Sequence, residues 1–216
     1  MPTPASATTE TPGDSTYRGA VKQLLRERLL DAAREQLRGR AWTQVTMAEI
    51  AASAGVSRQT LYNEFGNREE LGQALVIREG SRFMDAVERA IGEHADDPLA
   101  ALTAALERFL TIATTDPFVR LLLDDDGTGG LLPLVTTQSR PLLDWASKRV
   151  AGTIHVHWSG AVPADVQVLA DTLVRLAISH VTAPRHRPTQ TAAIITQLLA
   201  PSIERMLDGA EMASPS

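Results

Sequence analysis

Apolar residues recur at intervals of three and four along nearly the whole chain, and this helical periodicity constrains the fold more than any other feature. No segment alternates apolar and polar residues as a half-buried strand would. The sequence therefore predicts an all-α fold of about nine helices. The predicted helices cover residues 19–40, 46–54, 57–63, 67–94, 98–114, 117–124, 134–157, 163–183 and 189–207.

Prolines and acidic residues mark several of the predicted helix boundaries. Asp97-Pro98 and Asp116-Pro117 each combine a residue that caps helices with a proline, which is tolerated at the first helical position. Pro201 falls inside the last predicted helix. Because proline has no N–H to donate, we expect it to kink or split that helix.

Length and composition restrict the class of protein. The 216 residues are enough for one small and one medium domain, and the chain has no cysteine. No apolar run reaches the ~20 residues that span a bilayer. We therefore expect a cytoplasmic protein without disulfides, thiolate metal sites or membrane partners. The net charge is −5, yet residues 17–58 contain eight Lys/Arg and four Asp/Glu, so the basic charge is concentrated near the amino terminus.

The segment from Thr46 to Phe65 has the pattern of a helix-turn-helix. Thr46 and Glu49 form a T-x-x-E capping box for one short helix, and Ser57 can cap the next. Gly55 lies between them, where a tight turn needs a positive φ. The residues expected to form the core of this head are Trp42, Ile50, Val56, Leu61 and Phe65.

The sequence TMAEIAASAGVSRQTLYNEFGNREEL, which begins at Thr46, resembles the DNA-binding domain of the TetR family of bacterial transcriptional regulators. The resemblance is close over residues 20–75 and beyond them extends only to length and helix pattern. It implies a homodimer on double-stranded DNA with a variable carboxy-terminal ligand domain. The matching positions are Thr46, Ile50, Ala51, Ala54, Gly55, Val56, Ser57, Thr60, Leu61, Tyr62, Phe65, Glu70 and Leu71.

The second helix of this motif carries the residues predicted to contact DNA bases. Its first residues would approach the base edges of a major groove, and these are Arg58, Gln59 and Thr60. Arginine can bind guanine and glutamine can bind adenine with two hydrogen bonds each, while the threonine methyl can pack on thymine. Tyr62 and Asn63 lie about one turn further along, and the resemblance implies that the tyrosine contacts a phosphate.

Four further residues bear on contacts with the phosphate backbone. The hydroxyls of Thr46 and Ser57 can anchor phosphates, or they can serve as helix caps and nothing more. Family members often carry lysine where Arg68 stands, so Arg68 is expected to keep a phosphate contact. They often carry histidine where Glu64 stands. Because a carboxylate repels a phosphate, we expect Glu64 to turn away or to pair with a nearby arginine.

The chain is predicted to divide into a disordered arm (1–16), a helix-turn-helix head (17–66), a ligand-binding and dimerisation domain (67–210) and a disordered tail (211–216). A solvated arm is preferred over one that grips DNA. The last two long helices are the predicted dimer interface, which would hold two heads ~34 Å apart on a palindrome; the alternative is that these stripes are monomer core. The residues named for the interface are Leu169, Leu173, Leu176, Ile194, Ile195, Leu198 and Leu199.

The middle helices are rich in large apolar side chains. Each alone is more typical of core, but together they indicate an apolar cavity with a few polar groups at its edge. The residues predicted to line it are Phe83, Leu106, Phe109, Phe118, Leu121 and Trp145, with Arg175 and His180 as polar groups. The expected ligand is a small, largely apolar effector.

No pattern typical of enzyme chemistry is present. The sequence has no phosphate-binding glycine loop, nucleophile elbow or cysteine nucleophile. His155 and His157 diverge on a helix, and Asp124 to Asp126 lack the later ligands of a calcium loop, so no metal or cofactor is expected. The resulting hypothesis is a ligand-responsive dimeric repressor. The alternative is a helical ligand-binding or scaffolding protein with a vestigial helix-turn-helix.

Overall fold

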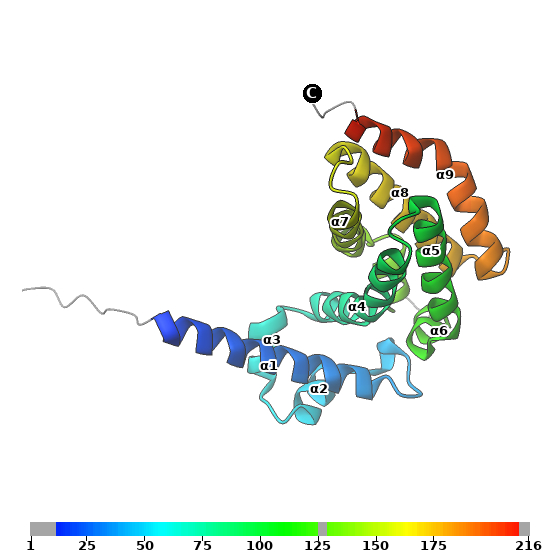
Figure 1. The fold of residues 1–216 in the computed structure, drawn as a ribbon. Helices are drawn as coiled ribbons and strands as arrows, with labels where there is room; N and C mark the ends of the chain where they lie inside the picture. Colours follow the sequence, from blue (N-terminus) through cyan, green and yellow to red (C-terminus); the bar gives the residue numbers. More distant parts are fainter. Residues whose placement is uncertain (1–11, 125–128, 212–216) are drawn as a thin grey trace, which may run out of the picture. The chain divides into compact units, whose positions relative to one another are not determined.

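The computed structural model describes residues 12–124 and 129–211, and every regular element among them is helical (Figure 1). The predicted all-α fold is confirmed. The elements, with η for a 3₁₀ helix, are α1 (Pro12–Gln36), η1 (Trp42–Gln44), α2 (Met47–Ser53), α3 (Arg58–Phe65), α4 (Arg68–Glu93), α5 (Pro98–Thr115), α6 (Pro117–Asp124), η2 (Leu132–Val135), α7 (Arg140–His157), α8 (Pro163–Thr182) and α9 (Pro188–Glu211).

The described chain forms two compact units. The first comprises residues 12–40 and 44–71, and the second comprises residues 41–43 and 72–211. The boundary between them falls inside α4, several residues beyond the predicted end of the head at residue 66. Because α4 is one uninterrupted helix, no change of composition or turn signal marks this boundary in the sequence.

The first helix differs from the prediction at both ends. It begins at Pro12, so residues 12–16 are helical instead of belonging to a disordered arm, while residues 1–11 lie outside the described part of the chain. Proline is well suited to the first helical position because its missing N–H has no partner there. The helix ends at Gln36, and Gly39 lies beyond it in a turn with a φ of +73°.

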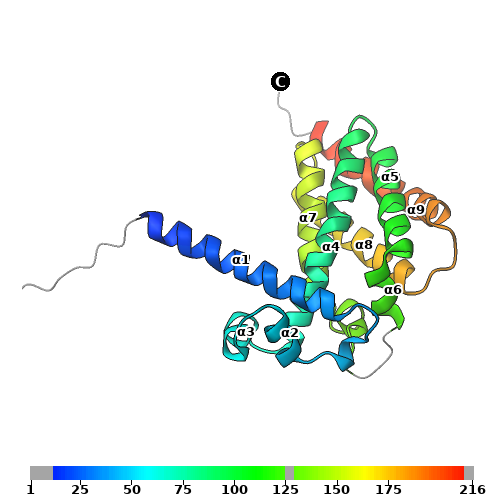
Figure 2. The same ribbon diagram turned by 90° about the horizontal axis from the view of Figure 1, so that it is seen from below.

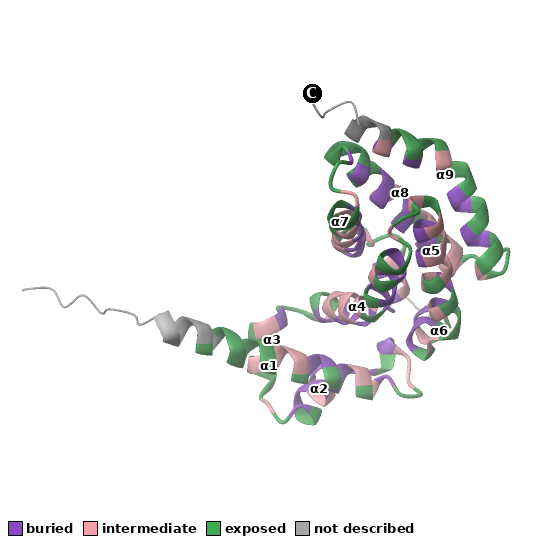
Figure 3. Ribbon diagram, in the orientation of Figure 1, coloured by how far each residue is buried: buried purple, intermediate pink, exposed green. Residues whose placement is uncertain are grey.

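The core of the first unit is formed where α1, α2 and α3 meet. Leu37, Ile50 and Leu61 are completely buried, and Phe65 is nearly so, which confirms three of the five residues expected in the core of the head (Figure 3). Trp42 is also buried but belongs to the second unit, and Val56 is only half-buried. Each helix of the head thus buries one face and exposes the other.

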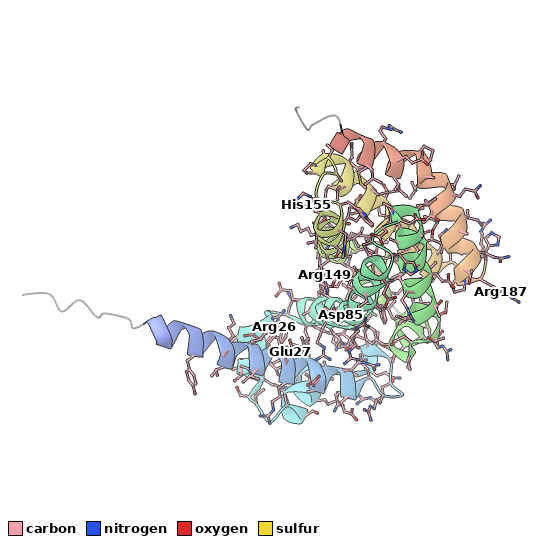
Figure 4. All side chains as sticks on the ribbon, in the orientation of Figure 1. Arg26, Glu27, Asp85, Arg149, His155 and Arg187 are labelled. Carbon is pink, nitrogen blue, oxygen red and sulfur yellow. The ribbon has the colours of Figure 1, made fainter. Side chains whose placement is uncertain are left out.

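The second unit is a bundle of the longer helices. Within it α5 packs along α9 (Figure 2), and α7 packs along α8. Buried apolar residues of α4, α5, α7, α8 and α9 form one continuous cluster. Arg149 of α7 bonds Asp85 of α4 at 3.0 Å and Glu88 at 2.6 Å, which links these two helices (Figure 4). No helix in residues 12–124 or 129–211 is long and apolar enough to cross a membrane.

Two differences between the predicted and observed helices concern prolines. The predicted helix 134–157 is in fact a 3₁₀ turn at Leu132–Val135 followed by α7, and Pro133 and Pro141 each lie in the first turn of one of these elements. Pro201 does not split α9, which continues to Glu211 as a single helix. Residues 212–216 of the predicted tail lie outside the described part of the chain.

Candidate nucleic-acid interface and internal cavity

The capping box at the start of α2 is present as predicted. The Glu49 N–H donates to Thr46 Oγ1 at 3.2 Å, and the Thr46 N–H donates to Glu49 Oε2 at 2.8 Å. Arg40 Nη2 lies 3.1 Å from Glu49 Oε1. The Thr46 side chain, the Thr46 N–H and Arg40 all favour the ionised carboxylate, so the pKa of Glu49 lies below its ordinary value of 4.5. The entry into α2 is therefore fixed by local bonds.

The turn between α2 and α3 depends on a glycine and a second cap. Gly55 has a φ of +68°, a conformation that residues with a Cβ rarely adopt. A Cβ at this position would also lie 3.0 Å from Nη2 of Arg28. Ser57 caps α3 by accepting from the Thr60 N–H at 3.1 Å, as predicted. These contacts set the angle at which α3 leaves the turn.

The exposed face of α3 gathers the residues predicted to contact DNA. Arg58, Gln59, Tyr62 and Asn63 are exposed, while the opposite face packs into the core. Gln59 Nε2 donates to Asn63 Oδ1 at 2.8 Å, so the two amides lie side by side one turn apart. This face therefore presents a cation, two amides and a phenol, which is the chemistry that reads bases and binds phosphates.

Thr60 is placed differently from its neighbours. Its side chain is half-buried, and its Oγ1 lies 2.8 Å from Ser57 Oγ, so the two hydroxyls share a hydrogen bond at the amino end of α3. In this conformation Ser57 caps the helix and the Thr60 hydroxyl bonds the capping hydroxyl. The Thr60 methyl is the part of this side chain that remains suited to an apolar contact with a base.

Glu64, whose carboxylate would repel a phosphate, is neutralised within the head. Its side chain is only 7% exposed, and its Oε1 lies 3.2 Å from Nη1 of Arg26 on α1. The guanidinium of Arg26 also lies over the Phe65 ring, 4.4 Å from its centroid. The expectation that Glu64 pairs with a nearby arginine is confirmed, and the partner lies 38 positions away in the sequence.

Arg68, predicted to bind a phosphate, has a partner in the protein. It is half-buried, and its Nη1 donates to the carbonyl oxygen of Val45. The contact holds the start of α4 against the segment that precedes α2, and this structural role was not foreseen from the sequence.

Ion pairs with glutamates neutralise part of the positive charge of the head. Arg26, Arg38 and Arg40 each pair with a glutamate of the same unit. Among the residues that the structure describes, no ion pair involves Arg28 or Arg58. These two arginines, one beside the turn and one at the start of α3, are the cations best placed to meet an anionic ligand.

A cavity of about 130 Å³ lies inside the second unit. By this measure one water molecule needs roughly 10–15 Å³, so the cavity has room for a small organic molecule. Phe83 and Phe109 meet edge to face in its wall, with ring centroids 6.1 Å apart. Five of the eight residues predicted to line a cavity do so: Phe83, Leu106, Phe109, Phe118 and Trp145.

The other three predicted lining residues do not reach the cavity. Leu121 lies half-buried on α6, and His180 lies half-buried on α8. Arg175 is exposed and bonds Asp171 at 2.8 Å, an interaction that raises the pKa of the guanidinium. Both polar groups lie on faces of α8 other than the one that lines the cavity.

The cavity wall contains a charged residue, Glu79, that was not predicted from the sequence. Val76, Glu79, Gly80 and Phe83 line the cavity from α4, at the spacing of one helix face. Glu79 is only 3% exposed. The available signal was a glutamate in the apolar stripe of a long amphipathic helix, where a charge is unusual.

The residues predicted for a dimer interface divide into two groups. Leu169, Leu173 and Ile195 are buried in the core of the second unit, and Leu173 also lines the cavity. Leu176 and Leu199 are half-buried against that core. Ile194 and Leu198, at 45% and 74% exposure, lie on the outer face of α9, and Val168 on α8 is an exposed apolar residue that the sequence analysis did not name.

Two family models match the chain, one for each part. Residues 29–75 match the model described as bacterial regulatory proteins, tetR family. Residues 97–201 match the model for the bacterial tetracyclin repressor, C-terminal domain. The chain is also 35% identical over 189 residues to the HTH-type transcriptional regulator AlkX of Mycobacterium tuberculosis, and the match covers 88% of this chain and 90% of that protein.

The fold also resembles solved structures of bacterial regulators. The crystal structure of the TetR family repressor AlkX from Dietzia sp. strain DQ12-45-1b, implicated in biodegradation of n-alkanes, is 31% identical with a TM-score of 0.72. The match covers 84% of this chain and 96% of that one. RolR in complex with resorcinol shares the fold, with a TM-score of 0.60 at 18% identity and coverage of 92% and 98%.

Proposed function

Because the chain belongs to the TetR family of bacterial transcriptional regulators, we propose that it is a dimeric repressor released from its operator by a small, largely apolar molecule. The observation that carries the proposal is the exposed face of α3. Arg58 and Gln59 are exposed in the first turn of α3, which Ser57 caps and which follows the turn at Gly55. Each well-placed bidentate contact to a base discriminates by about 1–3 kcal/mol.

Phosphate contacts would come from the edges of the same face. Tyr62 and Asn63 are exposed one turn further along α3. Arg28 lies beside the turn and Arg58 begins α3, and no ion pair involves either arginine among the residues that the structure describes. The hydroxyls of Thr46 and Ser57 lie at helix starts, where N–H groups attract anions. We also expect Arg68, at the start of α4, to contact a phosphate.

A dimer would supply the second half of the operator contacts. One head reads only a few base pairs, whereas two heads one helical turn apart read both halves of a palindrome. The apolar side chains exposed on α8 and α9, Val168, Ile194 and Leu198, support an interface built from these two helices. Unpaired apolar surface of this kind is costly to leave in water.

The cavity supports control by an effector. Its wall is almost entirely apolar, and the relative from Dietzia is described as implicated in the biodegradation of n-alkanes. α4 lines the cavity and also supplies residues to the first unit, so it is the element through which occupancy would reach the head. An effector can release the protein from the operator only if it binds the conformation that does not bind DNA more tightly than the conformation that does.

A footprinting experiment tests the proposal. DNA flanking the gene is incubated with the full chain at moderate salt, and the protected bases are mapped. We expect protection of two symmetric half-sites about one helical turn apart. Protection should disappear when an apolar effector is added. Absence of any preferred fragment would favour the alternative, a helical ligand-binding protein with a vestigial helix-turn-helix.

A further inference from the structure

Glu79 carries a charge into the wall of an otherwise apolar cavity. The residue is 3% exposed, and its neighbours along the cavity wall of α4 are Val76, Gly80 and Phe83. An ionised carboxylate removed from water needs partners that replace its hydration. Glu79 has such partners on its own helix.

Two arginines hold the carboxylate in place. Arg78 Nη2 lies 3.0 Å from Glu79 Oε1, and Arg82 Nη1 lies 3.4 Å from Glu79 Oε2. Neither arginine lines the cavity, and the Arg82 side chain is exposed. Glu79 thus lines the cavity, whereas the two arginines that pair with it do not.

The other polar side chains in the wall offer no comparable acceptor. The Thr182 hydroxyl donates to the carbonyl oxygens of Ile178 and Ser179, each at 3.1 Å. The indole of Trp145 can only donate. A carboxylate can accept about four hydrogen bonds, and the bonds it accepts are roughly twice as strong as those between neutral groups.

We propose that Glu79 determines effector specificity by accepting a hydrogen bond from a hydroxyl group at one end of an otherwise apolar molecule. This inference rests on the proposed function and names the chemical class of its effector. An alkane of the same length has no hydrogen-bond donor to offer the carboxylate. A fatty-acid anion would bring a second negative charge against Glu79. The cavity is therefore selective for an aliphatic alcohol.

A matched set of eight-carbon probes tests this selectivity. Binding of 1-octanol, n-octane and octanoate to the full-length protein is measured by the fluorescence of the tryptophans, since Trp145 lines the cavity. We expect 1-octanol to bind at least about tenfold more tightly than either other probe. Equal binding of 1-octanol and n-octane, tighter binding of octanoate, or binding of none of the three overturns the inference.

Variants separate recognition by Glu79 from a structural role. Glu79→Met should abolish the preference for 1-octanol over n-octane, because it keeps an apolar side chain of similar length without an acceptor. Glu79→Gln keeps one acceptor oxygen and loses the charge, so it should still prefer 1-octanol to n-octane and should discriminate less against octanoate. Thr182→Val is the control in the same wall and should leave all three affinities in their original order. An unchanged order in both Glu79 variants overturns the inference.

The ligand and DNA measurements test the two proposals separately. Probe binding is measured without DNA, and operator binding is measured without probe. Absence of selectivity in the unsubstituted protein, together with intact operator binding, would refute the role of Glu79 alone, whereas failure to bind any operator would refute the proposed function.

Discussion

Individual side chains in the head show how a departure from the family pattern is accommodated. Glu64 would oppose a phosphate if it faced DNA, but Arg26 holds its carboxylate at 3.2 Å and packs over Phe65 at the same time. The negative charge is thereby neutralised within the protein. The exposed face of α3 keeps its cation and amides.

Removal of Arg26 should therefore destabilise the head. Arg26→Ala leaves the buried carboxylate of Glu64 without its counter-ion, and we expect a loss of about 1–3 kcal/mol in the free energy of unfolding. The control is Arg38→Ala, because Arg38 pairs with Glu35 at 2.9 Å while 77% exposed, and such surface pairs contribute less than about 1 kcal/mol. Urea denaturation of both variants gives the comparison. Equal losses would refute the role assigned to Arg26.

The capping box predicts a dependence of stability on pH. The pKa of Glu49 is lower in the folded protein than its ordinary value of 4.5, so its contribution is complete above that value and disappears as the pH falls through the folded pKa. Glu49→Gln should lower Tm near neutral pH, and the difference from the original protein should shrink between about pH 5 and pH 3. Thermal melts at several pH values measure it. A difference that grows on acidification would contradict this account.

At the residue scale, sequence could predict what is local. The caps at Thr46 and Ser57 follow from neighbouring residues, and both are present. The pairing of Glu64 was foreseen, but its partner Arg26 was not, because the two residues meet only when α1 packs on α3. The bond from Arg68 to a carbonyl has no signature in the sequence at all.

At the scale of elements, α4 shows two glycines with different roles. A Cβ on Gly72 would lie 3.2–3.3 Å from Leu131, Leu134 and Trp42, closer than ordinary packing. A Cβ on Gly80 would lie 3.4 Å from Trp145, an ordinary contact. Gly72 permits close approach of its neighbours, whereas Gly80 only enlarges the cavity.

Alanine substitutions at these glycines should have different effects. Gly80→Ala removes the helix penalty of glycine and should stabilise the protein by about 0.5–1 kcal/mol. Gly72→Ala gains the same helix propensity but must displace its neighbours, so its net effect should be smaller or negative. Thermal melts compare the two variants directly. An increase in Tm at Gly72 equal to that at Gly80 would show that its neighbours yield at no cost.

Helix positions could be read from periodicity, but the role of each helix face could not. The stripe of α8 that carries Leu169 and Leu173 is buried in the core, and the sequence analysis assigned it to an interface. An apolar stripe has the same spacing whether it meets its own bundle or another chain. Prolines fix where η2 and α7 begin, yet Pro201 lies within a continuous helix, so their effect depends on the surrounding packing.

At the scale of the whole molecule, the account requires a dimer. Leu198→Glu places a charge on the outer face of α9, at a residue 74% exposed, and should shift the protein to monomers without loss of helicity. Val156→Glu is the matched control on α7, at 77% exposure, and should leave the dimer intact. Light scattering on eluting protein gives the masses, and dissociation by both variants or by neither would contradict an interface on α9.

The cavity is a property of the whole fold, and this limits what sequence could predict. Five aromatic and aliphatic lining residues were identified because large side chains of the middle helices must converge somewhere. Glu79 lines the cavity, whereas Arg175 and His180 do not. Which residues reach the cavity wall depends on how each helix is rotated about its axis. Periodicity does not determine that rotation closely enough.

The most direct test of the central claim is the specificity of DNA binding. Fluorescence anisotropy at fixed salt compares the affinity of the protein for its footprinted operator with that for a scrambled duplex. The account predicts that Arg58→Ala reduces this ratio by about tenfold or more, while Arg38→Ala, which removes an exposed charge of the same unit away from α3, leaves it nearly unchanged. A ratio unaffected by Arg58→Ala, or reduced equally by Arg38→Ala, would contradict the claim that the exposed face of α3 reads DNA.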